Sequence, residues 1–100
     1  MSKNIPINED TDKLFDAVRH LESVEECYAF FDDLCTVAEV NAIVQRFGVA
    51  RMLDEGLTYA EIEERTGAST ATISRINKCL THGEGGYRLA ITKLKAKKDD

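Results

Sequence analysis

The sequence predicts an all-α fold of about six helices that contains a helix-turn-helix. Capping-box patterns occur three times, each directly before a stretch with helical apolar periodicity, at Ser23, Thr36 and Thr58. Two short amphipathic segments flank a tight turn at Gly67. The chain has one proline, no tryptophan and few runs of β-branched residues, which disfavours a sheet. We therefore expect helices and no strands.

Composition places the chain among ordinary soluble domains. Its 100 residues are 43% apolar and 31% charged, as in globular proteins. No apolar run approaches the roughly 20 residues of a membrane-spanning helix, and the start MSKNIPINED lacks the layout of a secretory signal. We expect a cytoplasmic protein with no membrane partner.

The cysteines favour neither a disulfide framework nor a metal site. The three of them form no C-x-x-C pair, and their number is odd. Only His20 and His82 could supply nitrogen ligands, and neither lies near paired thiols. We expect no metal and no cofactor, and we interpret Cys27 and Cys35 as small core residues.

Positive charge is concentrated toward the end of the chain. The net charge is −6 over residues 1–34, −3 over residues 35–66 and +4 over residues 67–100, although the whole chain carries −5. A protein can attract phosphate with one face while the remainder stays acidic. The lysines at positions 93, 95, 97 and 98 are also compatible with a solvated tail.

The first half of the chain reads as three helices. Asn8 suits the start of the first, the second runs over residues 23–34, and the third runs from residue 36 to about residue 55, where Gly56 ends it. The apolar arc of the third helix is wider than packing on one side requires. Since a chain this short buries a limited fraction of its surface alone, we expect a homodimer formed through these helices.

The single domain therefore has three parts in sequence. Residues 1–56 mainly supply dimerisation helices, residues 57–81 form the helix-turn-helix, and residues 82–100 contain a glycine break and a C-terminal helix. The glycines at 83–86 lack the pattern of a phosphate-binding loop, so we interpret them as a break between helices.

The segment around Gly67 carries the predicted function. Gly67 can reverse the chain, Ser69 is a good N-cap for the helix 69–80, and three isoleucines, at 62, 73 and 76, can lock the two helices together. The second helix of such a unit enters the DNA major groove with its N-terminal residues toward the bases. The expected contacts with double-stranded DNA come from Thr58, Ser69, Thr70, Ala71, Thr72, Ser74, Arg75 and Lys78.

Other functions compete with this interpretation. The same two helices could form a protein-interaction module that docks on another regulator or a polymerase subunit, and the acidic first half would favour a basic partner. RNA binding ranks lower, because Tyr87 is the only aromatic residue after Tyr59 and no stacking platform exists. An enzyme is not expected, since no serine–histidine–acid arrangement occurs at a plausible spacing.

More than half of the chain resembles the Trp repressor family, in particular its YerC/YecD subgroup of small bacterial proteins. The resemblance rests on LTYAEI at residues 57–62, TGASTATISR at residues 66–75, CL at residues 79–80 and GGYRL at residues 85–89. It implies an intertwined all-helical homodimer that binds operator DNA and represses transcription. Its two recognition helices would lie about 34 Å apart on a pseudo-palindromic site. The Trp repressor is itself one of the proteins that define this docking geometry, so the geometry is not independent support.

The sequence departs from that family at the positions that resemble its tryptophan pocket. Of the two arginines that enclose the indole, Arg75 has a match, whereas Gln45 replaces the other. Ile76 replaces a glycine that leaves room for the ligand, and Cys35 and Cys79 replace hydroxyl residues that hold its charged groups. We interpret these five residues as a vestigial ligand pocket. Tryptophan is not expected to bind, and no other effector is implied.

Overall fold

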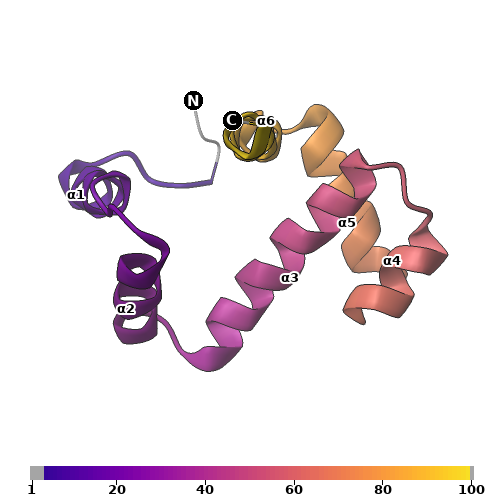
Figure 1. Cartoon of the computed structure of the whole chain (residues 1–100), viewed down its shortest axis with the longest axis horizontal. Helices are drawn as coiled ribbons and strands as arrows, with labels where there is room; N and C mark the ends of the chain where they lie inside the picture. The colour runs from indigo at the N-terminus through magenta and orange to yellow at the C-terminus, as the bar shows by residue number, and fades with distance from the viewer. Residues whose placement is uncertain (1–3, 100) are drawn as a thin grey trace. The chain divides into compact units, whose positions relative to one another are not determined.

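The computed structural model describes residues 4–99, with the side chains of residues 98 and 99 left aside. This part of the chain contains six helices and no strand, which confirms the predicted all-α class. In chain order (Figure 1) the helices are α1 (Glu9–Arg19), α2 (Val24–Leu34), α3 (Val37–Asp54), α4 (Tyr59–Thr66), α5 (Thr70–His82) and α6 (Gly86–Asp99). Within the described residues, no helix combines the length and the apolar content that a bilayer crossing requires.

Local capping explains where the helices begin. Asn8, Ser23, Thr58 and Ser69 are N-caps whose side chains accept a backbone N–H of the first turn. Thr36 also has both halves of a capping box: it accepts from the Glu39 N–H at 3.1 Å, and its own N–H donates to the Glu39 carboxylate at 2.8 Å.

The expected capping box at Ser23 is only half formed. Ser23 Oγ accepts from the Glu26 N–H at 3.1 Å, as predicted. The Glu26 carboxylate, however, accepts from the N–H of Glu22 at 2.9 Å, one residue before the N-cap. The N–H groups of Glu22 and Ser23 both precede the first N–H that donates within the helix. The carboxylate therefore still accepts from a backbone donor that has no partner in the helix.

The chain divides into two compact units, Met1–Val40 and Asn41–Asp100, and α3 begins in the first and continues in the second. Neither α1 nor α2 has a buried residue. Cys35 is half-buried, but Cys27 is exposed. The expectation that Cys27 is a core residue is therefore wrong, because these two short helices enclose no side chain.

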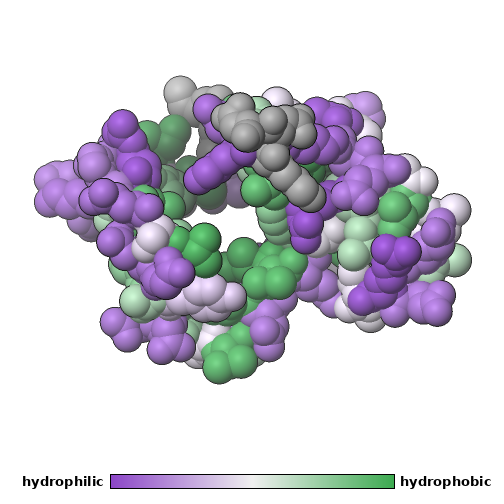
Figure 2. All heavy atoms as spheres, in the orientation of Figure 1, coloured by the Kyte–Doolittle hydropathy of each residue, from purple (hydrophilic) through white to green (hydrophobic). Residues whose placement is uncertain are grey.

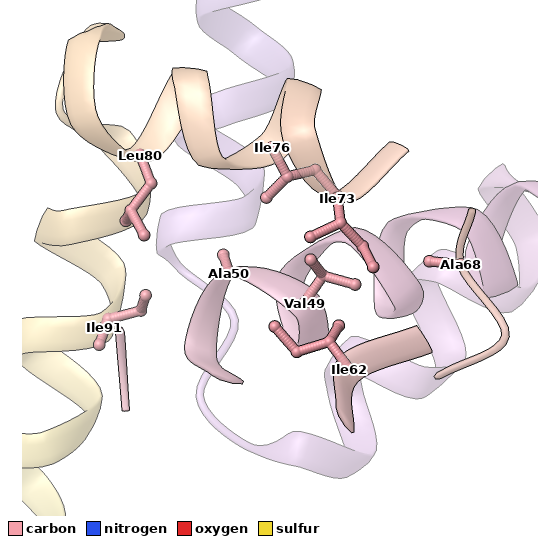
Figure 3. Close-up of a cluster of buried hydrophobic side chains, with 8 residues drawn as sticks. All are labelled: Val49, Ala50, Ile62, Ala68, Ile73, Ile76, Leu80 and Ile91. Carbon is pink, nitrogen blue, oxygen red and sulfur yellow. The ribbon is translucent and has the colours of Figure 1, made fainter. Parts of the chain in front are cut away.

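The second unit has a core of eight side chains contributed by four helices and the turn between α4 and α5. They are Val49 and Ala50 of α3, Ile62 of α4, Ala68 of the turn, Ile73, Ile76 and Leu80 of α5, and Ile91 of α6. Figure 3 shows Val49 between Ile62 and Ile73, and Leu80 opposite Ile91. Burial of each large side chain contributes about 1.5–3 kcal/mol. The core thus holds α4, α5 and α6 against the second half of α3.

The end of α3 has the hydrogen bonds of a Schellman motif. The Gly56 N–H donates to the Leu53 carbonyl and the Leu57 N–H to the Met52 carbonyl, both at 3.1 Å. Gly56 has a φ of +88°, which an L-residue rarely adopts. The prediction that Gly56 ends the third helix is confirmed.

An ion-pair network fastens α6 to the same end of α3. The Lys95 ammonium lies 2.6 Å from Oδ2 of Asp54, and the Arg88 guanidinium lies 3.4 Å from Oδ1. The hydrogen bond from Lys95 lowers the pKa of Asp54, and the same bond raises the pKa of Lys95. Lys95 is therefore paired with Asp54 of α3, whereas the side chain of Lys98 lies outside the described residues.

Apolar side chains lie open along α3. Val37 is 75% exposed, Val44 is 64% exposed and Ile43 is 43% exposed. Figure 2 shows hydrophobic atoms at the surface along the course of this helix. A helix of a globular protein normally buries such a stripe, so these three side chains form an exposed apolar face of α3.

Candidate nucleic-acid interface

The turn between α4 and α5 is fixed by short-range hydrogen bonds. Gly67 has a φ of +73°, and its N–H donates to the Glu63 carbonyl at 2.9 Å. The Ala68 N–H donates to Oγ1 of Thr66 at 3.1 Å. Ala68 itself is buried in the core. These contacts set the direction in which the chain enters α5.

The first turn of α5 is organised by Ser69. Its Oγ accepts from the Thr72 N–H at 3.2 Å and donates to the Thr72 hydroxyl at 3.0 Å. Thr72 is half-buried, whereas Thr70 and Ser69 are exposed. Of the predicted DNA contacts, Thr72 thus lies at the margin of the surface, and its hydroxyl is already engaged.

The remaining predicted contacts on α5 share its outer face. This face is defined by five exposed residues whose spacing follows the helical period, namely Thr70, Ala71, Ser74, Arg75 and Lys78. It carries two cations, and α5 contains no acidic residue. Ile73, Ile76 and Leu80 point the other way into the core (Figure 3). The structure therefore brings these five residues to one polar, cationic surface.

Thr58, the predicted contact outside α5, is the N-cap of α4. Its hydroxyl accepts from the Glu61 N–H at 3.2 Å, and its N–H donates to the Glu61 carboxylate at 3.0 Å. The hydrogen bond that the Thr58 N–H donates to the Glu61 carboxylate lowers the pKa of Glu61. The side chain is exposed, but its main visible role is to start the helix.

Glu63 is a residue at this surface that sequence reasoning missed. The Thr70 hydroxyl donates to Oε2 of Glu63 at 3.4 Å and so links α5 to α4. The pair is seven residues apart and spans the turn, so the contact becomes apparent only once the turn geometry is known.

The five residues of the vestigial ligand pocket have different surroundings. Ile76 is 3% exposed and belongs to the core, whereas Arg75 and Cys79 are exposed. Cys35 is the C-cap of α2, in the other compact unit. The Gln45 side-chain amide donates to the Thr66 carbonyl at 3.1 Å.

An open groove of about 400 Å³ lies beside Gln45. It is lined by Asn41, Val44, Gln45, Gly48, Arg51 and Thr66. Of the five vestigial-pocket residues, Gln45 is the one that lines this groove.

Comparison with known proteins identifies the family. The family model described as Trp repressor protein matches residues 9–95. This chain belongs to the Trp repressor family. The family is one of helix-turn-helix regulators that bind DNA, and α4 and α5 have the corresponding layout.

Three relatives each match 86% of this Trp repressor-family chain. The uncharacterized protein YerC of Bacillus subtilis (strain 168) is 52% identical over 86% of this chain and 83% of its own. A crystal structure from Staphylococcus aureus, described as that of a candidate Trp repressor, is 50% identical and has a TM-score of 0.82 over 86% of each chain. A TrpR-like protein from Eubacterium eligens ATCC 27750 is 46% identical with a TM-score of 0.82, over 86% of this chain and 89% of its own.

Proposed function

We propose that this Trp repressor-family protein is a sequence-specific transcriptional repressor that reads the DNA major groove with α5. The observation that carries the proposal is the outer face of α5, which is exposed and cationic and has no acidic residue of its own. Its two cations can attract phosphates and reach base edges, although Glu63 of α4 lies at one end of this face.

Each residue of that face has a chemically distinct role in the proposal. Arg75 can donate two hydrogen bonds to guanine, and Thr70 can contact either bases or phosphate near the helix N-terminus. Lys78, two turns after Thr70, supplies a phosphate contact.

The remaining predicted residues shape the surface. Ala71 and Ser74 are small enough for close approach to DNA. Ser69, Thr72 and Thr58 orient the first turns of their helices.

The proposed functional unit is a homodimer. Two copies of α5 about one DNA turn apart would read a pseudo-palindromic site. The exposed apolar residues of α3 support this assembly, because a second copy could cover them.

The proposed repressor does not respond to tryptophan. Ile76 is taken up by the core and the Gln45 amide is bonded to Thr66, so neither side chain is available to an indole. We expect isothermal titration calorimetry with tryptophan to give no saturable heat at micromolar protein. Saturable micromolar binding would contradict this part of the proposal.

The decisive experiment selects fragments of genomic DNA on the purified chain and then measures affinity for the selected duplex. We expect a two-fold symmetric site and an affinity that falls steeply with salt. Arg75→Ala should cost about 1–3 kcal/mol and relax the choice of sequence, whereas Lys78→Ala should weaken all duplexes alike. Lys13→Ala on α1 removes the same charge elsewhere and is the matched control.

The competing candidate is a protein-interaction module. It is favoured by the net charge of −6 over residues 1–34 and by the exposed apolar side chains of α1 and α2. In that case no duplex is preferred and Arg75→Ala leaves DNA binding unchanged. These two results together would overturn the proposed repressor.

A further inference from the structure

Gln45 joins α3 to the junction between α4 and α5. Its side-chain Nε2 donates to the carbonyl of Thr66 across 21 positions of sequence, at 3.1 Å, and the contact is partly buried. Thr66 is the last residue of α4 and directly precedes the left-handed Gly67. Its carbonyl belongs to the last turn, where carbonyls lack partners within the helix.

The other polar groups of Thr66 are also engaged. Its hydroxyl donates to the Ile62 carbonyl at 2.7 Å and accepts from the Ala68 N–H at 3.1 Å. The hydrogen bond from Gln45 therefore reaches a junction that these local hydrogen bonds already hold. Whatever holds Thr66 in place also holds Ser69, the N-cap of α5, three residues further on.

Two kinds of contact on α3, apolar packing and a hydrogen bond, place the helix pair. Val49 lies four residues after Gln45, hence on the same face, and is fully buried between Ile62 and Ile73 (Figure 3). Val49 and the neighbouring Ala50 hold the pair by apolar packing, which has no directional requirement of its own. The hydrogen bond is directional and restrains a second point, one helical turn away.

We propose that Gln45 is a positioning residue for α5, which fixes the direction of this helix relative to α3 without a bound small molecule. The inference deepens the proposed DNA-reading function and rests on it. Because α3 carries the apolar face proposed for dimerisation, the Gln45 contact sets how each reading helix projects from the dimer. The direction of α5 that suits DNA binding is then set by contacts within the chain and needs no bound small molecule.

The test compares variants that differ in one hydrogen-bond donor. Gln45→Met retains the side-chain length without a donor, and Gln45→Glu retains the shape but presents an acceptor to the carbonyl. Because the adjoining groove is open, water can reach the freed Thr66 carbonyl and both variants are expected to fold. Asn41→Ala is the matched control, since Asn41 is an exposed amide residue that lines the same groove one turn earlier.

Two measurements on the full chain test whether Gln45 positions α5. In the absence of DNA, amide hydrogen exchange at Gly67 and Ala68 is expected to accelerate about fivefold in both Gln45 variants, the factor for one net hydrogen bond, and to remain unchanged in Asn41→Ala. Affinity for the selected duplex is expected to fall about fivefold, with affinity for a random duplex of equal length unchanged.

The ratio of the two affinities separates positioning from mere stabilisation, since a partly unfolded protein loses both alike. Unchanged exchange in Gln45→Met, or equal losses on the two duplexes, would overturn the inference. If the unaltered protein prefers no duplex, the proposed function is wrong, and the exchange at Gly67 and Ala68 alone decides whether Gln45 restrains the turn.

Discussion

Gly67 reverses the chain between α4 and α5 in a left-handed conformation, with φ of +73°. A side chain in that region costs about 1–2 kcal/mol. We expect Gly67→Ala to lower the free energy of unfolding by about 1 kcal/mol, measured by urea denaturation. Gly86→Ala is the control, because Gly86 begins α6 and an added Cβ meets nothing within 4 Å. Equal losses in both variants would show that backbone conformation is not the cause.

For single residues, the sequence alone predicted the structural role wherever the signal is local. Ser69 and Thr58 are N-caps as predicted, because a cap needs only its own first turn. The partial burial of Thr72 was not foreseen, since it depends on how α5 packs against the other helices. The Glu26 carboxylate likewise takes the N–H of Glu22 instead of the adjacent one, a choice between near-equivalent donors that spacing cannot resolve.

At the scale of elements, the attachment of α6 to α3 depends on pH. The lowered pKa of Asp54 means that its contribution is present above its unfolded pKa of about 3.9 and is lost as the pH falls through the folded value. The raised pKa of Lys95 means that its contribution is present below about 10.4 and is lost as the pH rises through its folded value. The network therefore stabilises α6 between roughly pH 4 and pH 10.

Asp54→Asn is expected to remove this contribution. At pH 7 and low salt the Tm should fall by about 3 °C, a small effect because the Lys95 side chain is 60% exposed and water screens the pair. The difference from the unaltered protein should shrink as the pH falls below about 3.9 and through the lowered pKa of folded Asp54. Thermal unfolding at a series of pH values from 7 downward checks this, with the exposed Glu64→Gln as control. A difference that does not shrink as the pH falls would rule out the charge as the cause.

The element boundaries followed from the sequence far better than the contacts between elements. Caps and apolar periodicity predicted all six helices, since each signal lies within about one turn of the boundary that it specifies. The contacts of Gln45 with Thr66 and of Asp54 with Lys95 span 21 and 41 positions. A sequence pattern carries no direct signal for such pairs, because they depend on how helices pack.

At the scale of the whole molecule, the exposed apolar residues of α3 predict association. We expect sedimentation equilibrium at micromolar concentration to give twice the chain mass of 11.2 kDa. Val44→Glu is expected to shift the protein toward monomers, because Val44 is 64% exposed in the single chain and a buried unpaired carboxylate would oppose the interface. Thr92→Glu on α6 adds the same charge at an exposed polar position and should leave the mass unchanged. Monomers of the unaltered chain would contradict the proposed assembly.

The sequence predicted the candidate site only as far as it predicted α5, the helix that carries the site. Helical periodicity placed Thr70, Arg75 and Lys78 on one side of α5, and the structure brings them to one surface. The sequence could not reveal which acidic group of α4 approaches that surface. This depends on the angle at Gly67.

Through its contact with Thr70, Glu63 competes with DNA for the N-terminal end of α5. A carboxylate already lies 3.4 Å from the Thr70 hydroxyl, at the helix end where negative charge is favoured and where a phosphate would be drawn. Any duplex must displace this carboxylate, so its removal should help every duplex alike. Glu63→Gln should therefore tighten binding to random and selected duplexes by a similar factor, and unchanged affinities in a binding titration would refute this. One glutamate would thus lower the affinity for all DNA and leave the choice of sequence to the base contacts of α5.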